Sequence, residues 1–129
     1  MSATEVRESL LAQAYREAMR VSPADGAALI RSVLTPRLAA YVTGVQATKT
    51  VARWARGETA NLRTENATRL RVAYEIVRLL QHARESPETI QAWFLGMNPV
   101  LDDVSPARAL HDGNYKGVRA AACAFAAEG

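Results

Sequence analysis

The sequence predicts an all-α protein, and three observations carry that prediction. Four of the five prolines follow a hydroxyl residue: Ser22-Pro23, Thr35-Pro36, Ser86-Pro87 and Ser105-Pro106. A hydroxyl at the N-cap accepts a backbone N–H left free at a helix start, and proline at the first helical position loses no hydrogen bond. Alanine, the best helix former, dominates the composition. No stretch alternates apolar and polar residues for long enough to indicate a strand.

Taken in order, these signals predict helices near residues 4–21, 23–34, 36–43, 47–56, 65–85, 87–95, 106–112 and 115–127. Ser2 with Glu5 and Ser22 with Asp25 have the spacing of a capping box at the first two starts. Glycines mark the ends of four helices, at Gly44, Gly57, Gly96 and Gly113. The helix over 65–85 is the best indicated, because its apolar residues recur at helical spacing with arginines on the other faces.

We divide the chain into three parts. They are N-terminal helices over 1–35, a helix-turn-helix region with a long following helix over 36–85, and a C-terminal region over 86–129. A chain of 129 residues buries about two-thirds of its unfolded surface on folding, so its core needs no cross-link. Cys123 is the only cysteine, which excludes an internal disulfide and suits a reducing compartment.

The sequence also predicts the cellular location of the protein. Glu5, Arg7 and Glu8 stand where the apolar core of a signal peptide would begin. No apolar run approaches the ~20 residues that a membrane-spanning helix requires. We therefore expect a soluble cytoplasmic protein with no membrane partner.

Positive charge is concentrated in the middle of the chain. Residues 31–78 hold nine Lys or Arg against three Glu, so they carry +6, and the rest of the chain sums to −3. A basic middle flanked by mildly acidic ends is typical of a nucleic-acid-binding segment. A solvated helical surface would give the same layout, and charge alone does not separate the two interpretations.

The segment Thr50–Glu58, TVARWARGE, resembles the recognition helix of a helix-turn-helix. Val51 and Trp54 lie three residues apart and share one face, which can anchor the helix to its scaffold. Thr50 and Arg53 lie on a neighbouring face that stays free. Residues 36–43 would form the first helix of the motif, with Leu38 and Val42 inward, and glycine in the Thr43-Gly44-Val45 turn permits a positive φ.

In such motifs the residues near the start of the recognition helix touch base edges, and the others grip phosphates. We predict base contacts from Lys49 and Thr50, with Arg53 next, and backbone contacts from Arg56 and Arg63. Thr48, at the start of the same helix, completes the predicted DNA-binding set. The step from Gly44 to Val51 is one residue longer than in most helix-turn-helix proteins. It indicates either a slightly longer turn or a relic motif that no longer reads DNA, and an ordinary helical hairpin with exposed arginines is the alternative.

Residues for catalysis or metal binding are scarce. His82 and His111 are isolated, with no second His or Cys at the spacing of a metal pair. We expect His82 at the surface or an edge and His111 at a helix end, where an imidazole suits the helix dipole. Asp102-Asp103 fits a solvated turn better than a cation site. We expect no catalytic residue, no metal and no cofactor. We interpret Trp54 and Trp93, with Phe94 and Leu95, as core residues.

The C-terminal third carries a second recognisable pattern. It runs from Asn98-Pro99 through a short loop to Pro106, Leu110 and Gly113, and then to a terminal helix of small residues with Val118. This pattern resembles the toxin-binding domain of the MbcA–ParS–Xre antitoxin family. The VARW motif with a glycine three residues later also looks like members of that family, and the two blocks together cover about residues 36–129.

The resemblance implies a partner and a task. Family members typically neutralise a RES-domain toxin that degrades NAD, by pressing their C-terminal end against the mouth of its active site, and they repress their own operon. Carried onto this chain, the plug would be the helix from Tyr115 and the tail over 126–129. The terminal helix has a stripe for packing on the long helix, made of Tyr115, Val118, Ala122 and Phe125. The implied toxin-binding residues are Tyr115, Lys116, Arg119, Cys123, Ala126, Glu128 and Gly129.

The sequence is compatible with three functions. The first is an antitoxin with DNA and toxin surfaces, the second a stand-alone repressor whose C-terminal domain only dimerises it, and the third a protein-interaction module that has lost DNA binding. We expect a homodimer, because symmetric operators need a two-fold protein with recognition helices about 34 Å apart. Either the long helix over 65–85 or residues 1–35 would supply the interface.

Overall fold

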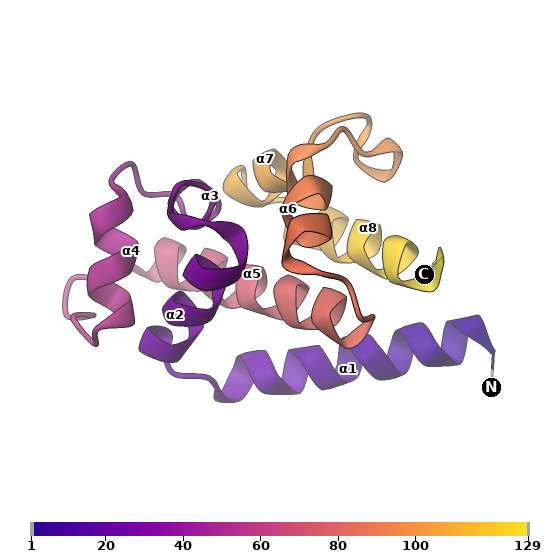
Figure 1. Ribbon diagram of the computed structural model, residues 1–129, viewed down its shortest axis with the longest axis horizontal. Coiled ribbons are helices and arrows are strands. Elements are labelled where there is room, and N and C mark those ends of the chain that lie inside the picture. Colours follow the sequence, from indigo (N-terminus) through magenta and orange to yellow (C-terminus); the bar gives the residue numbers. More distant parts are fainter. Residues whose placement is uncertain (1, 129) are drawn as a thin grey trace.

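The computed structural model describes residues 2–128 and confirms the all-α prediction (Figure 1). Over these residues the only β-pairing is an isolated bridge between Asn98 and Val104. The helices are α1 (Ala3–Arg20), α2 (Pro23–Leu34), α3 (Pro36–Thr43), α4 (Thr48–Ala55), α5 (Thr64–His82), α6 (Pro87–Leu95), α7 (Pro106–His111) and α8 (Tyr115–Glu128). A short 3-10 helix, η1 (Pro99–Leu101), precedes α7.

The predicted helix starts are confirmed at the hydroxyl–proline pairs. The hydroxyls of Ser22, Ser86 and Ser105 each accept the backbone N–H three residues later, at 3.1 Å. Thr35 caps α3 more weakly, at 3.4 Å, and does so from a left-handed φ of 82°.

The predicted end of the long helix is wrong by three residues. α5 ends at His82, because Arg84 adopts a left-handed φ of 67° and closes the helix. Glycine takes the equivalent position after α3, α4 and α7, with φ between 85° and 93°. Gly96 differs, since it follows α6 in an extended conformation with φ −83°.

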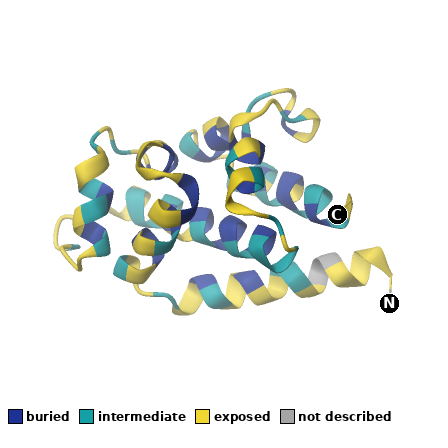
Figure 2. Ribbon diagram, viewed as in Figure 1, coloured by how far each residue is buried: buried dark blue, intermediate teal, exposed yellow. Residues whose placement is uncertain are grey.

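The long helix α5 forms the axis of the molecule (Figure 1). α1 runs antiparallel beside it, α2 to α4 pack around one end, and α6 to α8 cover the other. We call α2 to α4 the helix-turn-helix half and α6 to α8 the C-terminal half. Both halves pack around α5, so that a single core runs through the described chain (Figure 2). Its largest fully buried apolar side chains include Ile30, Leu34, Ile76, Leu79, Leu80, Ile90, Phe94 and Leu110. Trp54 and Trp93 are buried as predicted, but the prediction for Leu95 is wrong, because this last residue of α6 is 65% exposed.

None of the helices over residues 2–128 has both the length and the apolar character needed to span a membrane.

Candidate nucleic-acid interface

The turn between α3 and α4 is held by backbone and side-chain hydrogen bonds. Gly44 at φ 85° lets its own N–H reach the carbonyl of Tyr41, at 3.1 Å, and the N–H of Val45 reach that of Ala40, at 3.0 Å. The Asn66 amide on α5 donates to the Thr43 carbonyl at 2.7 Å. The turn is therefore tied to the central helix, and this fixes where α4 begins.

The extra residue between Gly44 and Val51 lies in the turn that joins α3 to α4. Val45, Gln46 and Ala47 separate the turn glycine from Thr48, the first residue of α4. Ala47 is the N-cap and offers no side-chain hydrogen bond, so the first turn of α4 presents uncapped backbone N–H groups.

The predicted division of α4 into an anchored and a free face is confirmed. Val51 is fully buried and Trp54 is 5% exposed, and both pack into the core beside α2 and α3. Arg53 is exposed as predicted, together with Lys49 and Arg56, but Thr50 is half-buried and so only partly free. Buried Ala39 and Ala40 on α3 leave room for this close packing.

One of the six predicted DNA-contacting residues is already in an ion pair. The guanidinium of Arg56 lies 3.1 Å from the Glu58 carboxylate, and both side chains are about 60% exposed. Such an exposed pair contributes little to stability, and phosphate can replace the carboxylate at low cost.

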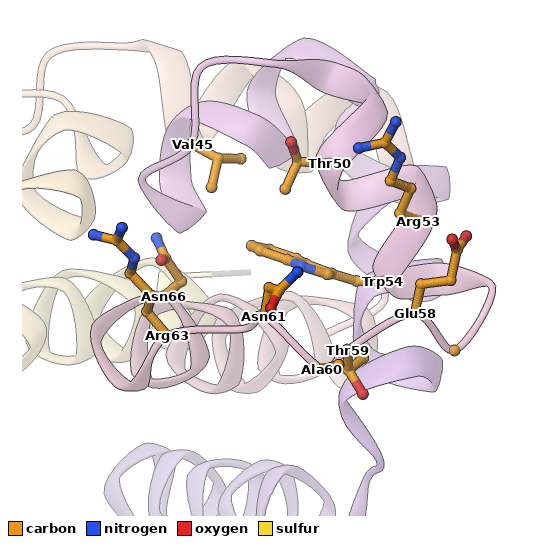
Figure 3. A pocket seen from close by; sticks show the side chains of 11 residues that line it. Val45, Thr50, Arg53, Trp54, Glu58, Thr59, Ala60, Asn61, Arg63 and Asn66 are labelled. Carbon is orange, nitrogen blue, oxygen red and sulfur yellow. The ribbon is translucent and has the colours of Figure 1, made fainter.

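A pocket of about 660 Å³ lies between α4, the following loop and the start of α5 (Figure 3). The Trp54 indole reaches into it, with Arg53 and Arg63 on opposite sides. Thr50 lines it as well, so three of the six predicted residues share this hollow. Thr48 instead lines a second hollow, beside Arg37 and Gln46.

Sequence reasoning missed Thr59, Asn61 and Asn66, which line the same pocket. They stand in and just after the loop that follows the recognition helix, at a point where hydroxyl and amide side chains commonly contact phosphate. The sequence did carry a signal for two of them, since Thr59 and Asn61 follow the helix-ending Gly57 closely.

The predicted toxin-binding residues of α8 differ in how far they are exposed. Lys116 and Glu128 are exposed, and Tyr115 and Cys123 are half-buried. Arg119 is only partly available to a partner, because its guanidinium pairs with the buried Glu75 carboxylate through two hydrogen bonds of 2.9 and 3.0 Å, and 36% of the side chain stays exposed. Hydrogen bonding to Glu75 raises the pKa of Arg119.

Ala126 is misplaced by the prediction, since it is buried at 9% exposure in the core. Gly129 lies outside the described residues. Val118 and Ala122 are buried as the predicted stripe requires, and α8 packs on α5. Phe125 lies beside Trp93 of α6, with ring centroids 6.3 Å apart.

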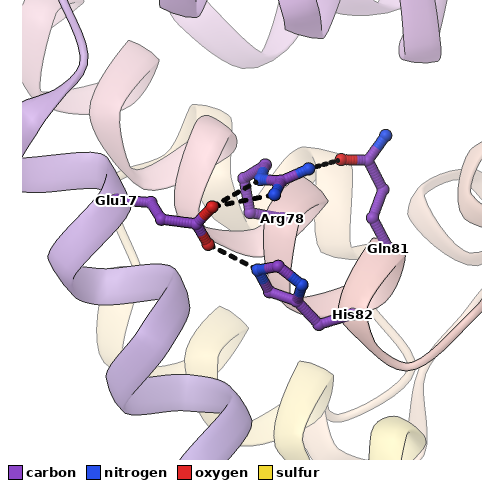
Figure 4. A network of polar contacts seen from close by, with 4 residues as sticks. All are labelled: Glu17, Arg78, Gln81 and His82. Carbon is purple, nitrogen blue, oxygen red and sulfur yellow. Dashed lines mark hydrogen bonds and ion pairs between the residues drawn. The ribbon is translucent and has the colours of Figure 1, made fainter.

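His82 is not isolated, because it belongs to a polar cluster between α1 and α5 (Figure 4). Its Nε2 and the guanidinium of Arg78 both contact the carboxylate of Glu17, and Arg78 also donates to Gln81. Burial raises the pKa of Glu17, but hydrogen bonds from His82 and Arg78 outweigh it, so the pKa lies below its usual range. The cluster holds α1 on the axis of the molecule.

His111 lies at the end of α7, as predicted, and connects the two halves. Its ring stacks on Tyr41 of α3 with centroids 4.4 Å apart, and its Nδ1 lies 2.8 Å from the Tyr41 carbonyl. Arg69 of α5 donates to the His111 carbonyl at 3.0 Å. The C-terminal region therefore braces the first helix of the helix-turn-helix.

Asp102 and Asp103 lie exposed in a left-handed turn. Among the side chains that the structure describes, which leave out those of residues 7 and 8, no three His, Cys, Asp or Glu come close enough to share a metal ion.

In comparisons with known proteins, no protein-family model, no curated protein and no solved structure is significantly similar to this chain.

Proposed function

We propose that this chain is the antitoxin of a toxin–antitoxin pair, which represses its own operon and neutralises a RES-domain toxin. DNA binding uses α4 and the pocket beside it. Toxin binding uses the C-terminal end, which occludes the active site of the NAD-degrading toxin. The observation that carries the proposal is the helix-turn-helix geometry, with α4 anchored by Val51 and Trp54 and its basic face exposed.

Four groups support the DNA half. Lys49 and Thr50 stand in the first turn of α4, where a recognition helix meets base edges. Arg53 and Arg63 flank the pocket, and the amides of its floor supply further donors for a phosphate backbone. A negatively charged duplex strand is the ligand that this set of donors suits best.

Binding to a duplex taken from upstream of the chain's own gene tests the DNA half, with fluorescence anisotropy as the readout. Arg53→Ala should weaken binding about tenfold, which is within the range expected for one base or phosphate contact. Arg63→Ala should weaken binding to all sequences alike and reduce the salt slope by about 1. Lys49→Ala should reduce the preference for this duplex over a scrambled one.

The matched control is Arg71→Ala, an exposed arginine on α5 that lies beside α1 and α2. It should leave DNA affinity unchanged. If it weakens binding as much as Arg53→Ala does, the interface is not on α4. If the wild-type chain binds no DNA, the helix-turn-helix is a structural hairpin.

The toxin half is supported by the resemblance of residues 36–129 to the MbcA–ParS–Xre family and by the exposure of Lys116 and Glu128. Since Arg119 and Ala126 are engaged inside the chain, the toxin surface reduces to the outer face of α8 and the tail.

Growth of cells that express a RES-domain toxin encoded beside this chain tests that surface. The wild-type chain should restore growth, and Lys116→Glu or removal of residues 128–129 should abolish the rescue. Arg31→Glu, at an exposed position on α2, is the control and should rescue fully. A chain that binds its operator but never rescues growth would be a stand-alone repressor.

A further inference from the structure

Three large apolar side chains are exposed where α6 ends and η1 begins. Leu95 is 65% exposed, Met97 is 79% exposed and Val100 is 52% exposed, within six residues of chain. This segment belongs to the largely exposed connection between α6 and α7 (Figure 2). Large apolar side chains gathered in this way mark contact surfaces more often than free surface.

A groove of about 430 Å³ lies beside this segment, between α6 and α8. The residues lining it include Trp93, Met97, Val100, Ala124, Phe125 and Glu128. Aromatic and small apolar side chains form most of its wall, and Glu128 is the charged group on its edge. Asp102 and Asp103 follow Val100 directly after η1, so this end of the molecule is acidic.

One polar atom at the groove lacks a partner. Trp93 is more than nine-tenths buried, and its Nε1–H has no hydrogen-bond acceptor among the described residues. The indole nitrogen is itself covered by the chain, so an occupant of the groove meets the ring of Trp93 and not its N–H.

A matching surface exists on α1 of the same chain. Tyr15 and Met19 are about half exposed, and at i and i+4 they share one face of the helix. Arg16 and Arg20 are exposed beside them, and neither takes part in an ion pair within residues 2–128. The Tyr15 ring and the Met19 side chain can pack in the apolar groove, and the arginines complement Glu128 and the two aspartates.

The central helix cannot provide the dimer contact that the sequence left open. Its apolar residues Val72, Ile76, Val77 and Leu80 are buried against the chain's own helices. α1 and α8 pack against each other, so the two complementary surfaces lie on neighbouring helices of one molecule. A two-fold rotation can place each over its counterpart and close the assembly.

We propose that this chain forms a two-fold dimer in which the Tyr15–Met19 face of one copy's α1 occupies the α6–α8 groove of the other. Met19 and the Tyr15 ring fill the apolar groove beside the Trp93 ring, and Arg20 approaches Glu128. A dimer is part of the proposed function, but this contact is tested without DNA or toxin, so its failure is separate from theirs.

Sedimentation of the full chain tests the proposal. The wild-type should reach twice its 14.0 kDa mass as loading rises to about 100 µM. Met19→Glu and Met97→Glu should each leave a folded monomer, because both side chains are more than half exposed and their replacement leaves the core intact. Val6→Glu is the matched control, since Val6 is an exposed residue on the opposite face of α1.

A charge exchange makes the test specific. Arg20→Glu and Glu128→Arg should each weaken the homodimer about tenfold, because like charges then face each other at both contacts. Mixing the two variants should restore a dimer, since every contact in the mixed pair again joins opposite charges.

The two tryptophans supply an independent readout. In a ¹H–¹⁵N spectrum of the chain the Trp93 indole signal should shift with concentration, while the Trp54 signal stays in place. A wild-type chain that remains monomeric at about 100 µM overturns the proposal. A dimer that survives Met19→Glu and Met97→Glu overturns it as well, as does a mixture of the two charge variants that stays monomeric.

Discussion

Four helices of this protein end with the same pair of backbone hydrogen bonds, but one of them lacks the usual residue. After α3, α4 and α7 the left-handed position is held by Gly44, Gly57 and Gly113, and after α5 it is held by Arg84. There the N–H of Arg84 bonds to Gln81 at 2.9 Å, and that of Glu85 bonds to Leu80 at 3.0 Å. A residue with a Cβ pays a conformational penalty at this position that glycine avoids.

Arg84→Gly should therefore stabilise the protein, by about 0.5–1 kcal/mol after the greater entropy of glycine in the unfolded chain is subtracted. Gly113→Ala should destabilise it by about 1 kcal/mol, and for conformational reasons alone, because no atom lies within 4 Å of the added Cβ. Urea unfolding followed by circular dichroism measures both. A loss of stability in Arg84→Gly would contradict the argument.

The Glu75–Arg119 pair is the other residue-scale feature with a large expected effect. Glu75 is 1% exposed, so its carboxylate depends on the two hydrogen bonds from Arg119. Arg119→Ala should cost about 3 kcal/mol, because it leaves a buried charge without a partner. The double variant Glu75→Leu with Arg119→Leu should recover most of that loss. Thermal unfolding of the two variants provides the measurement, and equal losses would show that packing rather than charge dominates.

At the scale of elements, the contact between α1 and α5 depends on pH. The carboxylate of Glu17 is held by His82 and Arg78, which places its pKa in the folded protein below the unfolded value near 4.5. The carboxylate therefore contributes stability above pH 4.5, and that contribution is lost as the pH falls through the lowered pKa.

We expect Glu17→Gln to lower the free energy of unfolding at pH 7 by about 1–3 kcal/mol. Below the lowered pKa, the variant and the wild-type should converge, since the wild-type carboxyl is then also neutral. Denaturant unfolding from pH 7 to pH 3 tests this, with Glu5→Gln at an exposed position of α1 as the control. A difference that stays constant over the whole range would show that the effect is not electrostatic.

At the scale of the whole molecule, α5 makes the two halves one folding unit. It packs on α1 and α2 and also on α7 and α8, and His111 bridges to Tyr41 across the two halves. We predict a single cooperative unfolding transition. Trp54 reports on the helix-turn-helix half and Trp93 on the C-terminal half, so single Trp→Phe variants allow each half to be followed by fluorescence. Different midpoints for the two probes would contradict the prediction.

Much of the fold was predictable because its signals are local. A hydroxyl before proline, a glycine after the last helical turn and an apolar residue every three or four positions depend only on neighbouring residues. These signals placed all eight α-helices, and they identified Val51 and Trp54 as the anchors of α4. The end of α5 was missed because arginine at a left-handed position carries no such signal.

The candidate sites were predicted less completely, since they depend on residues far apart in the chain. Glu75 and Arg119 are 44 residues apart, and Glu17 and His82 are 65 apart. Helical periodicity places Arg119 off the apolar stripe of α8. Only the packing of α5 against α8 shows that the Glu75 carboxylate lies next to it. The pocket beside Trp54 likewise needs the loop over 57–63 to fold back against α4.

The sequence by itself determined which segments are helical, where most of them begin and end, and which face of α4 is anchored, because these follow from the local chemistry of the backbone and side chains. The tertiary structure alone decided which charges are used inside the molecule and which remain for a partner. It paired Arg119 with the buried Glu75, left the basic face of α4 exposed and placed an apolar groove between α6 and α8. The physical reason is that burial and pairing depend on how the helices pack around α5, which no local pattern specifies.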